Sequence, residues 1–123
     1  MWFIPYNVPS SKNSKQFVRT PKGPRLVHSK VTAAYIKKTN DYYWAYSSEF
    51  KKAIKGKKPP YKVGFEFHRD RKRKFDYINA AQIVQDIMVK HGWVEDDNCE
   101  FLLPVFFPYF VDRKNPGVKI TLL

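Results

Sequence analysis

Two long stretches without glycine or proline restrict the fold of this chain more than any other feature of its sequence. They cover residues 32–54 and 76–91, in a chain of 123 residues that contains 9 prolines and 5 glycines. In the second stretch the apolar side chains fall on one face at about 100° per residue, as a half-buried helix requires. We therefore predict two main helices, the second of which buries Ala80, Ile83, Val84, Ile87 and Met88.

Residues beside these stretches support both helices. Ser29 is a candidate N-cap for the first helix, and Gly92 is a natural stop after the second. In the second helix Asn79, Asp86 and Lys90 fall within about 40° of one another, on a flank of the apolar face. A polar stripe at the edge of a core helix is a place for a functional site. The apolar side expected for the first helix consists of Ala34, Ile36, Tyr43, Trp44, Tyr46 and Phe50.

Alternation of apolar and polar residues predicts the strands. Residues 61–67 alternate, and a short strand is expected over residues 2–6. A hairpin is expected where residues 16–20 and 25–29 flank a Pro-Lys-Gly-Pro turn, and two further strands over 101–110 and 118–123 are joined through a turn at 115–117. The prolines of the first of these, Pro104 and Pro108, suit only a sheet edge or a bulge. The predicted fold class is α+β: one domain with a small mixed sheet and two main helices.

The sequence gives no sign of a membrane or secreted protein. It contains no run of the roughly 20 apolar residues that a membrane-spanning helix needs, and its first residues lack the charge and length of a signal peptide. We expect no membrane partner and a cytoplasmic location. The single cysteine, Cys99, cannot form an intramolecular disulfide.

The charge of the chain points to a polyanionic partner. Lys and Arg number 23 against 11 acidic residues, which gives a net charge of +12, and such a potential attracts nucleic acid. Residues 1–75 carry 19 of the basic and 4 of the acidic residues. The densest basic run covers residues 69–74, and it suits phosphate contact, although such runs are often only a solvated face. The candidate DNA-binding residues are Lys12, Lys15, Arg69, Arg71, Lys72, Arg73 and Lys74.

Carboxylates gather directly after this basic run. Six of the eleven acidic residues lie between Asp76 and Glu100. A divalent cation beside a phosphate backbone would give a basic protein a reason to keep such a cluster. Asp76 begins the predicted helix, whereas Asp96 and Asp97 follow it, so these acids meet only if the chain folds back along the helix.

The segment RKRKFDYINAAQIVQDIMVKHGWVEDDN, residues 71–98, resembles the central motif of RusA-type Holliday junction resolvases. In that family a basic run precedes D-x-D-N, a helix follows, and a turn with paired aspartates closes the motif. Asp76 matches the first aspartate and Asn79 the asparagine, while Asp86, Gly92, Asp96 and Asp97 fall in register. Residues 9–13 and 27–29 resemble the N-terminal half of the family more loosely.

The resemblance implies a RusA-like fold and a metal-dependent endonuclease that resolves branched DNA. It implies Mg²⁺, with Mn²⁺ as a substitute, held by Asp76, Asp97 and Asp96, with Asn79 and Asp86 in supporting positions. It further implies a homodimer, which makes paired nicks in a four-way junction, and an origin in a bacterial or phage-infected host cell.

Two positions depart from the family pattern. Ile78 stands where the family has its second aspartate, and Gln82 stands where it has a lysine implicated in catalysis. Lys90, or alternatively Lys74, would have to replace that lysine. The departures leave open a second interpretation, a catalytically weak or inactive nucleic-acid-binding relative. A purely structural or protein-interaction domain is a third, and it predicts no affinity for DNA.

Each site residue also has an ordinary structural interpretation. Asp76 suits the N-cap of a helix, and residues 96–98 suit a solvated turn. Asp86 and Asn79 could be surface residues of the helix. The histidines, His28, His68 and His91, lack the spacing of metal ligands, and a surface or capping role is expected for each.

Overall fold

The computed structural model describes residues 1–10 and 15–123, and for residues 15 and 16 the backbone alone. Its two helices and mixed sheet confirm the predicted α+β fold class. The elements are β1 (Trp2–Pro5), β2 (Lys15–Thr20), β3 (Gly23–His28), α1 (Lys30–Ala53), β4 (Tyr61–Arg69), α2 (Tyr77–Lys90), β5 (Leu102–Phe106), β6 (Phe110–Val111) and β7 (Gly117–Leu122).

The larger sheet is built around β4. Its strand order is β1-β7-β4-β5, and the short β6 also pairs with β4. β7 is antiparallel to both β1 and β4, whereas β5 and β6 run parallel to β4. The predicted strand over 101–110 is therefore two strands, and β7 lies on the opposite side of β4 from them. Pro104 lies in β5, at the sheet edge, where a missing N–H is tolerated.

The two helices differ in how well their buried faces were predicted. In α2 all five predicted apolar residues are buried. In α1 the expected Ala34 and Trp44 are exposed, Trp44 by 72%. The buried stripe instead includes small hydroxyl side chains, which hide their polarity by hydrogen bonding: Thr39 donates to the Tyr35 carbonyl and Ser47 to the His91 carbonyl. The buried residues of α1 are Thr32, Tyr35, Thr39, Tyr43, Ser47 and Phe50.

The predicted N-cap of α1 and the predicted stop after α2 are both confirmed. The Ser29 hydroxyl accepts a hydrogen bond from the Thr32 amide at 3.3 Å and so begins α1. Gly92 has a φ of 74° and ends α2 in the left-handed region that glycine tolerates.

Trp93 directs the chain that returns from α2. Its indole N–H donates to the Tyr43 carbonyl at 2.8 Å, and its ring packs against Trp2 and Phe50 with centroids 5.9 and 5.2 Å apart. Trp93 is 1% exposed. Because this residue is fixed in the core between β1 and α1, the segment that follows it, including Asp97, returns along α2.

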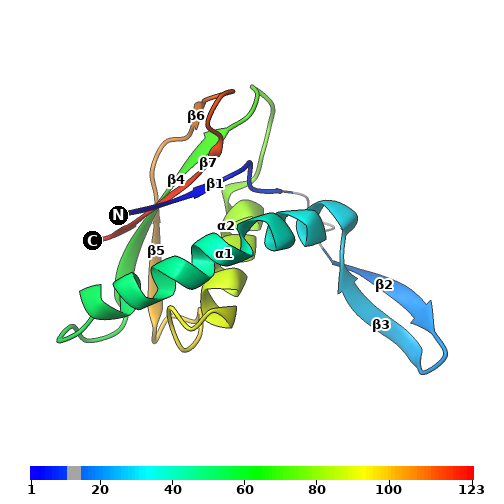
Figure 1. Cartoon of the computed structure of the whole chain (residues 1–123), viewed down its shortest axis with the longest axis horizontal. Coiled ribbons are helices and arrows are strands. Elements are labelled where there is room, and N and C mark those ends of the chain that lie inside the picture. The colour runs from blue at the N-terminus through cyan, green and yellow to red at the C-terminus, as the bar shows by residue number, and fades with distance from the viewer. Residues whose placement is uncertain (11–14) are drawn as a thin grey trace.

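The hairpin β2–β3 stands apart from this body. Within the described residues, β2 and β3 pair only with each other, as the prediction for residues 16–29 required. Figure 1 shows the hairpin projecting past the beginning of α1, away from the sheet. Neither helix described is long and apolar enough to cross a membrane.

Candidate functional site

The structure joins two of the motif carboxylates through Gln82. The Gln82 side-chain nitrogen donates to Asp86 Oδ1 at 2.8 Å and to Asp97 Oδ2 at 3.1 Å. A carboxylate can only accept hydrogen bonds, so the amide nitrogen, rather than the oxygen, must face both groups. Asp86 comes from α2 and Asp97 from the segment after it, and both are half-buried. The chain therefore folds back along α2, but Asp97 reaches Gln82 and Asp86 rather than Asp76, the partner that the sequence predicted.

Asp76 lies at another turn of the helix. It is the N-cap of α2, and its Oδ1 accepts from the Ile78 amide at 3.0 Å. Gln82 lies six residues later, which is about 9 Å along the helix axis. Asp76 is exposed, and its capping role is the ordinary structural interpretation of this residue.

Asp96 organises the turn before Asp97. Its Oδ1 accepts from the Asp97 amide at 2.7 Å, and its Oδ2 accepts from the Asn98 side chain at 3.1 Å. Over residues 1–10 and 15–123, no three His, Cys, Asp or Glu side chains gather closely enough to hold one metal ion. The structure thus brings Asp97 to Asp86, and it leaves Asp76 and Asp96 outside that pair.

The Asp86–Asp97 pair offers carboxylate oxygens, a kind of ligand that Mg²⁺ prefers. Magnesium prefers oxygen ligands and is commonly held by one or two carboxylates, with water and substrate phosphate completing the shell. The neutral amide of Gln82 now satisfies one oxygen of each carboxylate. A cation between the two aspartates would replace that amide as their shared partner.

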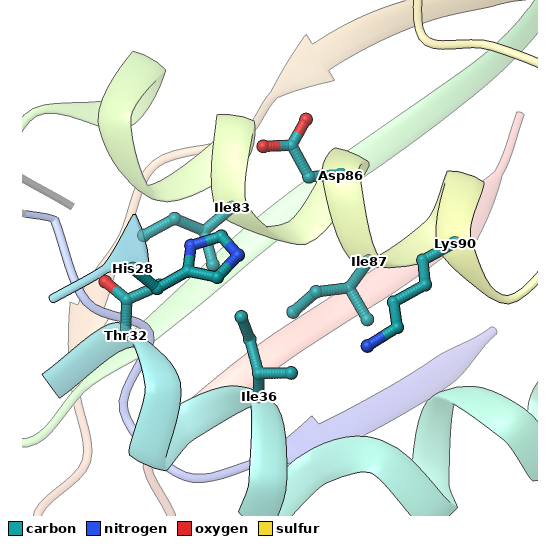
Figure 2. A pocket seen from close by; sticks show the side chains of 7 residues that line it. All are labelled: His28, Thr32, Ile36, Ile83, Asp86, Ile87 and Lys90. Carbon is teal, nitrogen blue, oxygen red and sulfur yellow. The ribbon is translucent and has the colours of Figure 1, made fainter. Parts of the chain in front are cut away.

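A small cavity adjoins Asp86. Its volume is about 110 Å³, and its walls come from the first turns of α1, the end of β3 and α2. Figure 2 shows apolar side chains on its sides and His28, Asp86 and Lys90 around it. Lys90, the predicted substitute for the missing lysine, therefore shares this cavity with Asp86, although no ion pair among the described residues joins them. The complete lining is His28, Thr32, Ile36, Ile83, Asp86, Ile87 and Lys90.

Two residues of this site were not assigned to it from the sequence. In the sequence Gln82 stands out only as a departure from the family, although its position four residues before Asp86 is a spacing at which helical side chains meet. His28 ends the hairpin, and its place beside α2 depends on how the hairpin joins the body. Periodicity carries no signal for such a contact.

Asn79 holds the loop after β1. Its side-chain nitrogen donates to the Ser10 carbonyl at 3.2 Å. The predicted supporting residue is therefore engaged with the protein backbone, on the same helix as Gln82 and Asp86.

The prediction that Arg69 contacts phosphate is wrong, because the residue is buried. Its side chain is 2% exposed, its Nη1 donates to the Val8 carbonyl at 2.6 Å, and its guanidinium lies 4.4 Å from the centre of the Phe75 ring. Burial lowers the pKa of this guanidinium. The reason is strand alternation: Arg69 continues the buried face of β4 that begins with Val63, Phe65 and Phe67. Arg69 is a core residue here and not a surface cation.

The remaining cations of the run are accessible. Arg71, Lys72, Arg73 and Lys74 are all exposed, between the end of β4 and the cap of α2. Within the part of the chain that the structure describes, their only ion pair joins Arg73 to Asp70 at 3.9 Å, at the surface, and such a pair contributes little. Of the other DNA-binding candidates, Lys12 lies outside the described residues, and only the backbone of Lys15 is described.

Comparison with known proteins adds no relative to this description. No family model matches the chain, and no curated protein matches it. The resemblance to RusA-type resolvases therefore depends on the motif residues themselves.

Proposed function

We propose that this chain is a metal-dependent endonuclease that binds branched DNA and hydrolyses its phosphodiester bonds. One observation carries the proposal: Asp97 returns along α2 and shares the Gln82 amide with Asp86. Two carboxylates from different segments are thereby brought together, and a run of four exposed cations precedes α2 in the chain. That combination suits a phosphate backbone on the cations and a hard cation on the acids.

Each residue has a distinct role in this proposal. Asp86 and Asp97 would hold Mg²⁺ or Mn²⁺, whereas Asp76 caps α2 about 15 Å from Asp86 along the helix axis and stays outside the site. A cation at this position would supply activation of water and neutralisation of charge on the scissile phosphate. Lys90 lies beside Asp86 and provides a positive charge at the edge of the site, while Asp96 holds the turn that presents Asp97. Residues 71–74 bind backbone phosphates and supply salt-sensitive affinity.

The test uses a labelled four-way junction with Mg²⁺, with Mn²⁺ and with EDTA. We expect nicks with either metal and none with EDTA. Asp97→Asn should abolish nicking and keep binding, because removing one negative charge does not weaken an interaction made by cations. Glu49→Gln, which changes an exposed carboxylate on α1, is the matched control and should nick normally. Nicking by Asp97→Asn at the wild-type rate would show that the site is elsewhere.

A second candidate function is binding of branched DNA without cleavage. The observation that favours it lies at the two departures from the family: Ile78 is 68% exposed where an aspartate is expected, and the Gln82 amide occupies the position between Asp86 and Asp97. Restoring both residues in an Ile78→Asp, Gln82→Lys double variant separates the candidates. If the double variant cleaves the junction and the wild type does not, the natural chain binds DNA without cutting it. Cleavage by the wild type would exclude this second candidate.

Paired nicks also require two sites. A symmetric homodimer would provide them, and we include a dimer in the proposal. Light scattering after size-exclusion chromatography, with and without a junction, tests it. A monomer in both conditions would leave an enzyme that makes single, unpaired nicks.

A further inference from the structure

The hairpin β2–β3 exposes apolar side chains on a positively charged arm. Phe17 is 76% exposed and Leu26 50% exposed. Residues 15–28 contain four Lys or Arg residues and no Asp or Glu. Arg19, Lys22 and Arg25 are exposed, and none of them takes part in an ion pair among the described residues. An isolated two-stranded hairpin is only marginally stable in water, so such an arm gains stability when a partner covers it.

The register of the hairpin places Phe17 and Leu26 on one face. They lie directly opposite each other, and opposed residues of antiparallel strands share a face. Arg19 lies two residues after Phe17 on β2 and shares this face as well. Val18 and Arg25, the next opposed pair, point to the other face. One face therefore combines an accessible aromatic ring, an aliphatic support and a cation.

The same face of the hairpin also bears a residue of the candidate site. His28 follows Leu26 by two residues, so its side chain continues the face that bears Phe17. His28 lines the cavity beside Asp86 and Lys90, and its ring lies between the hairpin end and α2 in Figure 2. The Phe17–Leu26 pair is thus about 7 Å along the strands from a residue that borders the site.

We propose that Phe17, supported by Leu26, stacks on an unpaired base of branched DNA, while the hairpin cations bind phosphates of the same strand. The inference rests on the proposed function, because it names the part of the substrate that lies next to the site. Aromatic rings on a cationic surface bind single strands in this way, since every base has a face on which to stack. Duplex DNA offers Phe17 no such face unless its bases are separated.

Charge decides between DNA and a second copy of the chain as the occupant of this face. Two hairpins in contact would bring their cations together without any acidic partner within residues 15–28. A nucleic acid strand provides both the negative charge and the flat apolar surface that the face lacks.

The experiment measures affinity for three labelled DNAs: a single strand of thymidines, a four-way junction and a matched duplex. Phe17→Ala should weaken binding of the single strand and of the junction by roughly fivefold or more and leave duplex binding unchanged. Phe17→Leu keeps the apolar packing with Leu26 and lacks the aromatic ring, so it should show nearly the same effect. Phe17→Trp should bind as the wild type does. Val18→Ala, on the other face of the hairpin, is the control and should change nothing.

Several results would overturn the inference. Equal weakening on all three DNAs would mean that Phe17 maintains the hairpin and does not stack on bases. Unchanged binding by Phe17→Ala would leave the ring without a role in DNA contact. Loss of a dimer in Phe17→Ala, seen by light scattering, would make the face an interface between copies. If the wild type binds none of the three DNAs, the proposed function fails together with the inference, whereas a junction bound normally by Phe17→Ala sinks the inference alone.

Discussion

The body of the molecule and its hairpin use the same kinds of side chain in opposite ways. In the body, the aromatic Trp93 is 1% exposed and hydrogen-bonded, whereas in the hairpin Phe17 is 76% exposed. Removing apolar area from water stabilises a fold, so the body accounts for most of the stability. The hairpin keeps its apolar area free, which suits recognition. The comparison indicates that the body carries the stability of the fold, whereas the proposed DNA binding is assigned to the hairpin.

Arginine shows the same division over a much shorter distance. Arg69 is buried and hydrogen-bonded to the Val8 carbonyl, while Arg71, two residues later, is exposed. The strand β4 ends between them. The end of a strand therefore separates a cation that stabilises the fold from cations that face the solvent.

The largest expected effect is a loss of stability when a core residue of the body is replaced. Trp93→Ala should lower the free energy of unfolding by about 3–5 kcal/mol, because it removes a large buried ring and leaves a cavity. Trp44→Ala, at an exposed tryptophan of α1, should change it by less than about 0.5 kcal/mol. Urea unfolding of both variants measures the difference. Similar decreases for the two would mean that the stability is not concentrated in the body.

Arg69 should give the next largest effect. In Arg69→Ala the buried Val8 carbonyl is left without its donor, which costs about 1–3 kcal/mol, and no guanidinium packs on the Phe75 ring. Arg71→Ala should leave stability within about 0.5 kcal/mol of the wild type and weaken DNA binding. Thermal unfolding and a DNA titration of both variants test the pair. If Arg69→Ala instead weakened DNA binding and left stability unchanged, Arg69 would be a phosphate-binding residue after all.

The exposed cations should control the salt dependence of binding. Replacing residues 71–74 with alanine should reduce the slope of log affinity against log salt by about 0.9 for each duplex phosphate that these side chains neutralise in the wild type. A control variant with Lys55, Lys57 and Lys58 changed to alanine removes similar charges beyond the end of α1. Anisotropy titrations at several salt concentrations give both slopes. Equal slopes for the two variants would indicate attraction by net charge alone.

The smallest effect concerns pH. Burial, and secondarily the charge of Lys90, lower the pKa of His91 below its ordinary value of 6.5, and its Nε2 has no partner among the described residues. The unfolded chain therefore takes up a proton at His91 more readily than the folded chain. Stability should fall as the pH drops through about 6.5. His91→Gln should flatten this decline in urea titrations, and a rise in wild-type stability at acidic pH would contradict it.

Most elements could be predicted from the sequence because their signals are local. The apolar face of α2, the alternation of β4 and the cap at Ser29 depend on residues within a few positions of one another. The buried face of α1 was partly wrong because its Thr and Ser residues are buried with hydrogen bonds, which apolar periodicity does not detect. The pairing of β5 and β7 with opposite sides of β4 depends on the path of the whole chain.

In the candidate site, too, the contacts between residues close in sequence were predictable, and those between distant residues were not. The capping role of Asp76 and the hydrogen bond of Gln82 with Asp86 follow from helical spacing alone. The return of Asp97 depends on Trp93, which is anchored to the Tyr43 carbonyl 50 residues earlier in the chain. Because Tyr43 lies outside residues 76–97, no sequence pattern within that segment reveals this hydrogen bond. Likewise, the alternation of β4 could have assigned Arg69 to the buried face, but the basic residues that follow it favoured a surface role.

The junction between β3 and α1 has a consequence for the direction of the hairpin. β3 ends at His28, and the next residue, Ser29, caps α1 by accepting a hydrogen bond from the Thr32 amide. The hairpin is therefore joined, with no intervening loop, to a helix that packs on the body. A substitution at Ser29 would alter the direction of the hairpin while leaving the residues of its strands unchanged, so the geometry of one helix end can determine which bends in the proposed substrate are accommodated.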